Sequence, residues 1–385
     1  MPKILFISHC VPPVPFGPSF VLQKLFKHLP QDSYVVYTTC SDKSANHAPP
    51  KLPCKYYYAP AHSIYVDYTL WVSIREWLEI LPMVKEGIKI VREEKISSIL
   101  VYPTAGNCLL TAYLISKICR IPFSIYMLDL FSAVQTYRLR RLFSVLFEQT
   151  AMRSARTVFV MSETLQDYYL NKYGINSILL PHPCDTERYQ QPFEDNGAVS
   201  DSKKRIVFTG MIYEAQLDSL LNLVQAIKEM TDIEFHIYSQ RTPRKLMELG
   251  ISGQNVVHHG FVDQESLAQI QRQADILFLP MAFNSPYPDL IKTASPSKLP
   301  EYLASGRPII VHAPPYSYIT WYATRYGWGE VVDKPDINTL KQAVQTLLHN
   351  KRRCSLLVEN ALKTLKRHDS ARVANTLIKN LDISL

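Results

Sequence analysis

Several features that define other protein classes are scarce or missing in this sequence. Only 12 of its 385 residues are glycine, which argues against glycine-rich phosphate loops as the main binding device. The seven cysteines are odd in number, scattered and without a C-x-x-C pair, so the sequence indicates neither a metal site nor a disulfide framework. We expect reduced, buried thiols in a cytoplasmic protein.

Long apolar segments are missing as well. No stretch reaches the roughly 18 apolar residues of a membrane-spanning helix, and the best candidate, 108–118, is interrupted by Lys117. The first apolar run is too short for a secretory signal, and we expect a chain that does not span a membrane. No zinc-finger, RNA-binding or basic-zipper pattern occurs, so nucleic acid is not an expected partner.

What the sequence does contain is a regular alternation of strand and helix patterns. The length favours two domains, and the alternation predicts a parallel sheet with helices on both faces in each half. A polar stretch at 186–204 is interpreted as the linker between domains 1–185 and 205–365, with a helix at 366–385 that crosses back onto the first domain. The expected strands are 3–8, 33–39, 99–102, 123–128, 157–161, 177–181, 205–209, 233–238, 256–258, 276–279 and 309–311.

The most informative segment is 295–311, which reads SPSKLPEYLASGRPIIV. Pro296 and Ser297 suit the first turn and the cap of a helix. Gly306 stands where a helix needs a left-handed terminator, and strand composition follows it. The pattern predicts Lys298 and Glu301 at the start of a short helix. A cation beside a helix N-terminus suits a phosphate, and a carboxylate one turn later can accept hydrogen bonds from ribose hydroxyls.

This segment resembles the donor-binding motif of retaining GT-B glycosyltransferases, often called family 4, in which P-S-K-x-x-E-Y-x-A-x-G-x-P-V holds the nucleotide diphosphate and ribose. The resemblance implies an α/β fold of two doubly wound Rossmann-like domains facing across a cleft. It also implies sugar transfer from a UDP- or GDP-linked donor, which is a substrate and not a cofactor. The donor-binding residues that it implies in this segment are Ser295, Ser297, Lys298, Leu299 and Glu301.

The likeness extends to Gly210, the strand-end glycine that would let the backbone approach the diphosphate. Relatives carry an arginine and a lysine soon after this glycine, both on phosphate oxygens, where this chain offers Tyr213, Glu214 and Gln216. The cationic role is therefore expected to fall on Lys298, with Lys292 as a second candidate.

A second departure concerns the family's E-x7-E pair, whose second glutamate matches Glu301. The first is replaced by Thr293, with Asp289 as the nearest preceding acid. Backbone N–H groups around Thr293 and Ser295 are then expected to hold the transferred sugar.

In the first domain, Gly17 is the only glycine of the loop after the first strand, which argues against a dinucleotide-binding G-x-G-x-x-G. Relatives bear a glycine-containing loop here that touches the donor and the acceptor, which makes Gly17 a candidate donor-binding residue; a rigid turn without a ligand is the alternative. Asp129 matches the strand-end acid of relatives, where desolvation could raise its pKa enough to act on an acceptor hydroxyl. A helix-capping aspartate is the alternative.

We therefore expect a retaining glycosyltransferase of cell-surface polysaccharide or glycolipid synthesis, with Asp129 and Lys298 as catalytic residues and no metal. A sugar-nucleotide epimerase on the same fold and a catalytically silent nucleotide-binding module are the alternatives.

The acceptor is expected to be a glycan or a lipid-linked molecule. The net charge of +8 and the basic cluster Arg138, Arg140 and Arg141 suggest peripheral association with an anionic membrane at its inner face. A core helix with a solvated basic edge is the alternative reading of that cluster.

Overall fold

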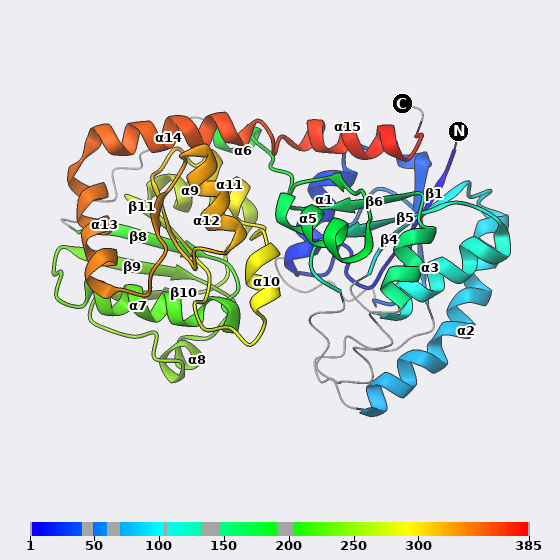
Figure 1. Cartoon of the computed structure of the whole chain (residues 1–385), viewed down its shortest axis with the longest axis horizontal. Coiled ribbons are helices and arrows are strands. Elements are labelled where there is room, and N and C mark those ends of the chain that lie inside the picture. Colours follow the sequence, from blue (N-terminus) through cyan, green and yellow to red (C-terminus); the bar gives the residue numbers. More distant parts are fainter. Residues whose placement is uncertain are drawn as a thin grey trace. The chain divides into compact units, whose positions relative to one another are not determined.

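The computed structural model describes residues 2–40, 49–59, 70–103, 106–131, 147–190 and 203–383 (Figure 1). The chain forms two compact units, one made of Met1–Pro183 with Ser370–Leu385 and the other of Cys184–Asp369. The linker interpretation of 186–204 falls partly outside the described residues; within it, Glu187–Gln190 forms helix α6 and Lys204 begins a strand.

The first unit is built on a parallel sheet of seven strands in the order β3-β2-β1-β4-β5-β6-β7. Its central strands are apolar on both faces, as expected where helices cover the sheet on each side. The strands are β1 Ile4–Ser8, β2 Tyr34–Thr38, β3 Tyr56–Tyr58, β4 Ser98–Tyr102, β5 Phe123–Met127, β6 Thr157–Val160 and β7 Ile178–Leu179.

Helices before and after these strands complete the first unit. They are α1 Gly17–Phe26, η1 Gln31–Ser33, α2 Leu70–Glu93, α3 Gly106–Cys119, α5 Glu163–Tyr173 and α15 Ser370–Asn380. Helix α15 packs against α1, although it follows the whole second unit in the chain (Figure 1). His28 and Ser370 share a hydrogen bond of 2.9 Å at this contact.

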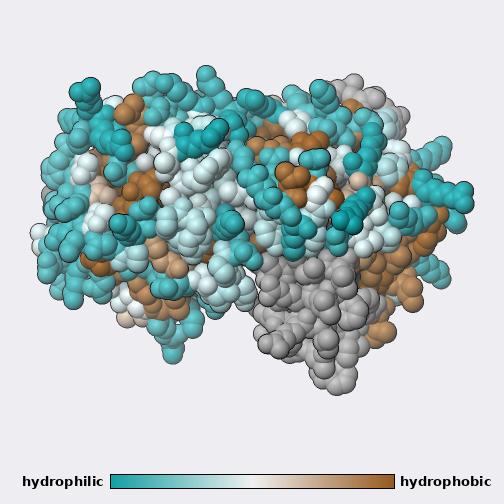
Figure 2. Space-filling model, in the orientation of Figure 1, coloured by the Kyte–Doolittle hydropathy of each residue, from teal (hydrophilic) through white to brown (hydrophobic). Residues whose placement is uncertain are grey.

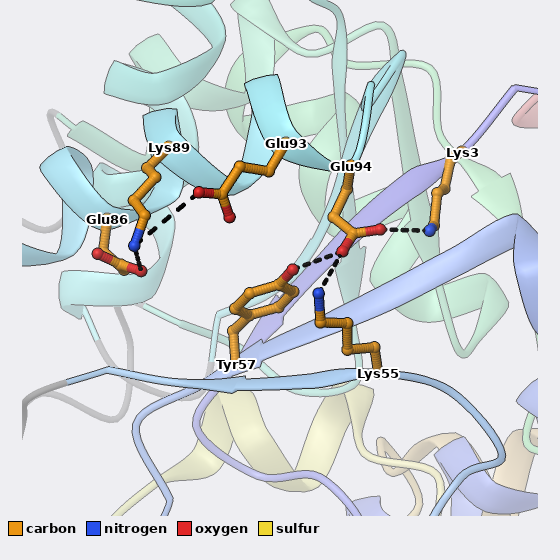
Figure 3. Close-up of polar contacts among 7 residues, drawn as sticks. All are labelled: Lys3, Lys55, Tyr57, Glu86, Lys89, Glu93 and Glu94. Carbon is orange, nitrogen blue, oxygen red and sulfur yellow. Dashed lines mark hydrogen bonds and ion pairs between the residues drawn. The ribbon is translucent and has the colours of Figure 1, made fainter.

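One edge of the first unit carries a polar cluster around Glu94, which lies just beyond α2 (Figure 3). The Glu94 carboxylate accepts hydrogen bonds from Lys3 Nζ at 2.5 Å, Tyr57 Oη at 2.5 Å and Lys55 Nζ at 2.7 Å. These bonds tie the end of α2 to the start of β1 and to the edge strand β3.

The second unit has a parallel sheet of six strands in the order β10-β9-β8-β11-β12-β13. In both units the strand order is that of a doubly wound sheet, which confirms the predicted fold class. The strands are β8 Lys204–Thr209, β9 Ile233–Tyr238, β10 Val256–His259, β11 Ile276–Pro280, β12 Ile309–His312 and β13 Glu330–Val332.

The helices of the second unit cover both faces of its sheet. Apolar side chains of α7, α13 and α14 pack against one face of β8, β9 and β11, and the side chains of α9 and α11 meet Thr209 on the other. The helices are η2 Glu214–Gln216, α7 Leu217–Ile227, α8 Pro243–Glu248, α9 Gln264–Gln273, α10 Pro288–Thr293, α11 Leu299–Ala304, α12 Tyr318–Tyr326, α13 Ile337–His349 and α14 Lys351–Leu365.

Two local expectations need correction. Helix α11 begins at Leu299, with Lys298 at its N-cap and Pro300 in its first turn, so Pro296 and Ser297 lie before it. The helix expected at 366–385 begins only at Ser370, as α15, because the chain turns between α14 and α15 at residues 366–369. The left-handed Gly306 is confirmed, with φ of +72°.

Hydrophobic surface is visible beside α2, while hydrophilic residues cover much of the face shown in Figure 2. Two leucines of this helix, Leu78 and Leu81, are 71% and 76% exposed. No described helix is both long and apolar enough to cross a membrane.

Candidate functional site

The candidate site of the second unit lies at the carboxyl ends of β8 and β11. The strand order reverses between these two strands, and in doubly wound sheets ligands bind outside the carboxyl ends at such a switch point. Gly210 follows β8 directly, and the loop after β11 leads through α10 to Lys298. The sheet thus brings together two residues that are 88 positions apart in the sequence.

Lys298 is the most unusual side chain of this site. The residue is 9% exposed, and its Nζ has no hydrogen-bond partner among the described residues. The ammonium lies 3.8 Å from the centroid of the Phe208 ring, a cation–π contact that offsets only part of the cost of burial. A buried, unpaired ammonium is a strong binding group for an anion that enters the site.

Burial also sets the protonation of this lysine. Desolvation lowers the pKa of Lys298 to about 7, and the nearby Glu301 carboxylate acts in the opposite direction. At neutral pH the side chain therefore exists in both forms, and an incoming phosphate would favour the charged one.

Gly210 stands next to Lys298 with backbone angles that favour glycine. Its φ is +118°, and its N–H donates to the Tyr238 carbonyl at 2.8 Å. A Cβ at this position would lie 3.1 Å from both Cε and Nζ of Lys298. A side chain at this position would therefore have to displace the Lys298 ammonium.

A chain of hydrogen bonds fixes the end of β8 before this glycine. Thr209 N–H donates to Tyr302 Oη at 2.9 Å, and Gln271 Nε2 donates to Thr209 Oγ1 at 3.2 Å. Tyr189 Oη completes the chain by donating to Gln271 Oε1 at 2.6 Å. The sequence analysis missed these supporting residues; Tyr302 could have been suspected, since it lies within the motif at 295–311.

Glu301 lies in the first turn of α11 and is 8% exposed. Its charge raises the pKa of Lys298 and adds to the rise that desolvation causes in the pKa of Tyr189 and Tyr302. The structure thus brings Gly210, Lys298 and Glu301 together.

Most of the other residues predicted to bind the sugar donor have buried side chains. Thr293 is buried, and its hydroxyl donates to the Asp289 carbonyl at 2.9 Å, while Ser295 is also buried. Leu299 is fully buried, and its N–H donates to the Pro296 carbonyl at 2.9 Å. Ser297 is exposed just before α11. Of these four, only Ser297 presents a side chain to solvent.

In the first unit, Asp129 follows β5, also at the carboxyl edge of its sheet. The surrounding protein raises the pKa of Asp129 to about 7 by desolvation. Asp129 is nevertheless exposed to solvent, and water that reaches its carboxylate offsets part of this rise in pKa. Its charge also contributes to the raised pKa of the buried Tyr102 at the end of β4, a neighbour that the sequence analysis did not single out.

Gly17 begins α1 and is exposed, and no described contact joins it to Asp129. Both residues belong to the first unit, whereas the other predicted site residues belong to the second. The basic cluster of Arg138, Arg140 and Arg141 lies outside the described residues. Among the residues that the structure describes, no group of three His, Cys, Asp or Glu side chains is arranged to hold a metal ion.

Comparison with known families gives a match that coincides with the second unit. Residues 203–350 match the family described as glycosyl transferases group 1. This range contains Gly210, Lys298 and Glu301, so the residues gathered at the switch point lie within the matched domain. A search of curated protein sequences gave no match.

Solved structures resemble the whole chain. Sucrose-phosphate synthase from Thermosynechococcus elongatus superposes with a TM-score of 0.74 at 15% identity over 98% of each chain. Anabaena HepE in complex with UDP and glucose has a TM-score of 0.70 at 13% identity, with both chains fully covered. WaaG, a glycosyltransferase involved in lipopolysaccharide biosynthesis, has a TM-score of 0.68 at 14% identity over 99% of this chain and 100% of its own. The chain therefore has the GT-B fold.

Proposed function

We propose that this chain, a glycosyltransferase by the family of its second unit, transfers a sugar from a nucleotide-sugar donor to an acceptor hydroxyl with retention of configuration. The observation that carries the proposal is the buried Lys298 ammonium, which has no hydrogen-bond partner among the described residues and lies beside Gly210 in the matched domain. HepE, which shares the fold, was solved with UDP and with UDP-glucose, in line with a nucleoside diphosphate as the anion.

In this proposal the donor diphosphate lies against Lys298 and the backbone of Gly210. The bond between the sugar carbon and the diphosphate oxygen breaks, and its electron pair stays on the diphosphate. Lys298 stabilises the negative charge that develops on this leaving group, an electrostatic contribution that is large in a site from which water is excluded. Helix α11 has only six residues, so the lysine and not the helix dipole carries this role.

The acceptor is assigned to the first unit, at Asp129. The acceptor oxygen forms the new bond to the sugar carbon, and its proton passes to the ionised Asp129 carboxylate. A pKa raised towards neutrality makes this carboxyl group a better proton acceptor than an ordinary aspartate. The retention of configuration and the role of Asp129 rest on the family resemblance.

Thr293 favours a second candidate, a nucleotide-binding module without transfer activity. It replaces the first glutamate of the family's acidic pair, and its hydroxyl is occupied by the Asp289 carbonyl. A transferase releases a nucleoside diphosphate from UDP-glucose or GDP-mannose, whereas a silent module binds these donors and leaves them intact. Conversion of the sugar without release would instead indicate an epimerase.

The proposal also includes the acceptor, which is a lipid-linked molecule or a glycan. The reaction then belongs to cell-surface synthesis at the inner face of a membrane. This part of the proposal is supported by the net charge of +8 and by the fold shared with WaaG. Sedimentation with anionic vesicles at low salt tests the membrane step, and binding should fade as salt rises.

The test of the function is calorimetric binding of UDP and GDP to the wild type and to Lys298→Ala. Loss of the charged hydrogen bonds should weaken the preferred diphosphate by about 1.5–3 kcal/mol while the fold survives. Lys228→Ala is the control, since this lysine is exposed at the C-cap of α7, the end of that helix away from the connection to β8. Equal affinity of wild type and Lys298→Ala in a folded protein would refute the assignment.

A further inference from the structure

Gln216 is a buried side chain whose amide oxygen is unused within the described part of the protein. It lies at the N-cap of α7 and is 2% exposed. Its Oε1 is buried and has no hydrogen-bond partner among the described residues. Although Gln216 occupies the N-cap position of α7, its side chain makes no capping hydrogen bond to the helix. A buried acceptor without a donor destabilises a fold, and its retention needs a reason.

The position of Gln216 connects it to the candidate site. It lies in the short connection from β8 to α7, six residues after Gly210. The neighbouring Ala215 carbonyl accepts from Ala282 N–H at 2.7 Å, in the loop after β11. Two residues later, the Asp218 carboxylate accepts from the N–H groups of Phe283 and Asn284 at 3.1 and 2.7 Å.

These bonds hold the connection after β8 against the loop after β11, on either side of Gln216. The residue is therefore fixed at the same switch point as Gly210 and Lys298.

Gln271 shows what a buried glutamine with a structural role looks like in this unit. It is fully buried, its Nε2 donates to Thr209 and its Oε1 accepts from Tyr189. Both ends of that amide are satisfied by the protein, whereas Gln216 Oε1 has no partner among the described residues. The contrast favours a ligand as the missing partner of Gln216.

The missing partner must be a hydrogen-bond donor, because the buried atom is an acceptor oxygen. Ionised phosphate oxygens are acceptors and cannot fill this role, but the hydroxyls of a sugar can. We propose that Gln216 Oε1 accepts a hydrogen bond from a hydroxyl of the transferred sugar. The inference rests on the proposed function, and it supplies a sugar-binding acceptor in a chain whose Thr293 lacks the carboxylate of the family pattern.

The experiment compares Gln216→Leu with wild type in two measurements. In the first, calorimetry gives the affinities for UDP and GDP and for the matching intact donors, UDP-glucose and GDP-mannose. Loss of a neutral hydrogen bond should weaken the intact donor about three- to tenfold and leave the nucleoside diphosphate unchanged. In the second, the melting temperature of the ligand-free variant should stay level or rise, because an unsatisfied buried acceptor has been removed.

Gln271→Leu is the matched control, and its ligand-free melting temperature should fall since two partners lose their bonds. A similar fall in Gln216→Leu would show a structural role and overturn the proposal. So would an unchanged affinity for the intact donor. If the wild type binds no nucleoside diphosphate, both the proposed function and the Gln216 proposal are refuted. If donor binding is lost in Lys298→Ala but is unchanged in Gln216→Leu, only the Gln216 proposal is refuted.

Discussion

A Cβ atom built on Gly210 would stand 3.1 Å from the Nζ of Lys298, closer than most side-chain contacts allow. The glycine and the lysine come from opposite sides of the switch point between β8 and β11. The present position of the ammonium therefore depends on the absence of a single methyl group.

Gly210→Ala should consequently impair donor binding and stability together. The methyl group displaces the Lys298 side chain, and φ of +118° is strained for alanine, at a cost of about 1–3 kcal/mol in the free energy of unfolding. Calorimetry with UDP and GDP and denaturant unfolding measure the two effects. Gly174→Ala is the control: its φ is +68° and no atom lies within 4 Å of the added Cβ, so it should lose stability and keep donor affinity.

The pKa of Lys298 predicts a pH dependence of donor binding. Since this pKa is about 7 in the free protein, the lysine is mostly neutral at pH 8.5 and mostly charged at pH 5.5. The bound diphosphate favours the charged form, so binding at pH 8.5 should take up a proton and affinity should fall as pH rises above 7. Calorimetry in two buffers of different ionisation enthalpy measures the uptake. Persistence of the full uptake in Lys298→Met would assign it to another group.

Glu301→Gln tests which part of the donor this carboxylate holds. If it accepts hydrogen bonds from the ribose, the variant should bind the nucleoside diphosphate more weakly, by about 1.5–3 kcal/mol for bonds to a charged group. The intact donor should weaken equally. A loss confined to the intact donor would place Glu301 on the transferred sugar, where we expect Gln216 instead.

The cluster around Glu94 predicts a change in stability and not in activity. Three donors hold the pKa of Glu94 at about 2, below its ordinary value of 4.5. Glu94→Gln should lower the free energy of unfolding by about 1–2 kcal/mol at neutral pH, with the exposed Lys55 contributing least. Because the folded pKa is depressed, this stabilisation is present above pH 4.5 and is lost as the pH falls towards 2.

Denaturant unfolding at several pH values measures this difference. Glu93→Gln is the neighbouring control, since Glu93 is 51% exposed and reaches only Lys89, at 4.0 Å. Equal effects of the two substitutions would contradict the prediction.

Much of the fold was predictable because strands and helices leave local patterns. The strand at 233–238 has the predicted bounds, and Gly306 takes the left-handed conformation expected of a helix terminator. Helix α2 was not predicted. It contains Pro82, which removes a backbone donor, and Gly87, where an added Cβ would lie 2.2 Å from Cδ1 of Ile115. That close packing on α3 is a long-range contact that no local pattern reveals.

The site was predictable in its residues but not in its electrostatics. The motif at 295–311 identified Lys298 and Glu301 as partners at the start of a helix. The ammonium lies over the ring of Phe208, 90 positions earlier, and its position tolerates no side chain at Gly210. The unused amide oxygen of Gln216 is likewise a property of packing, since sequence shows only that a glutamine stands where relatives carry a cation.

The packing of α15 on α1 has a consequence for synthesis on the ribosome. The second unit, Cys184–Asp369, is 186 residues long and is made before α15. At about 5–20 residues per second its synthesis takes about 10–40 s. During this interval the first unit lacks the helix whose Val373, Leu377 and Ile378 are buried in the finished protein. The nascent chain therefore exposes an apolar face of its first unit while the second one folds, and this is the stage at which a chaperone would bind it.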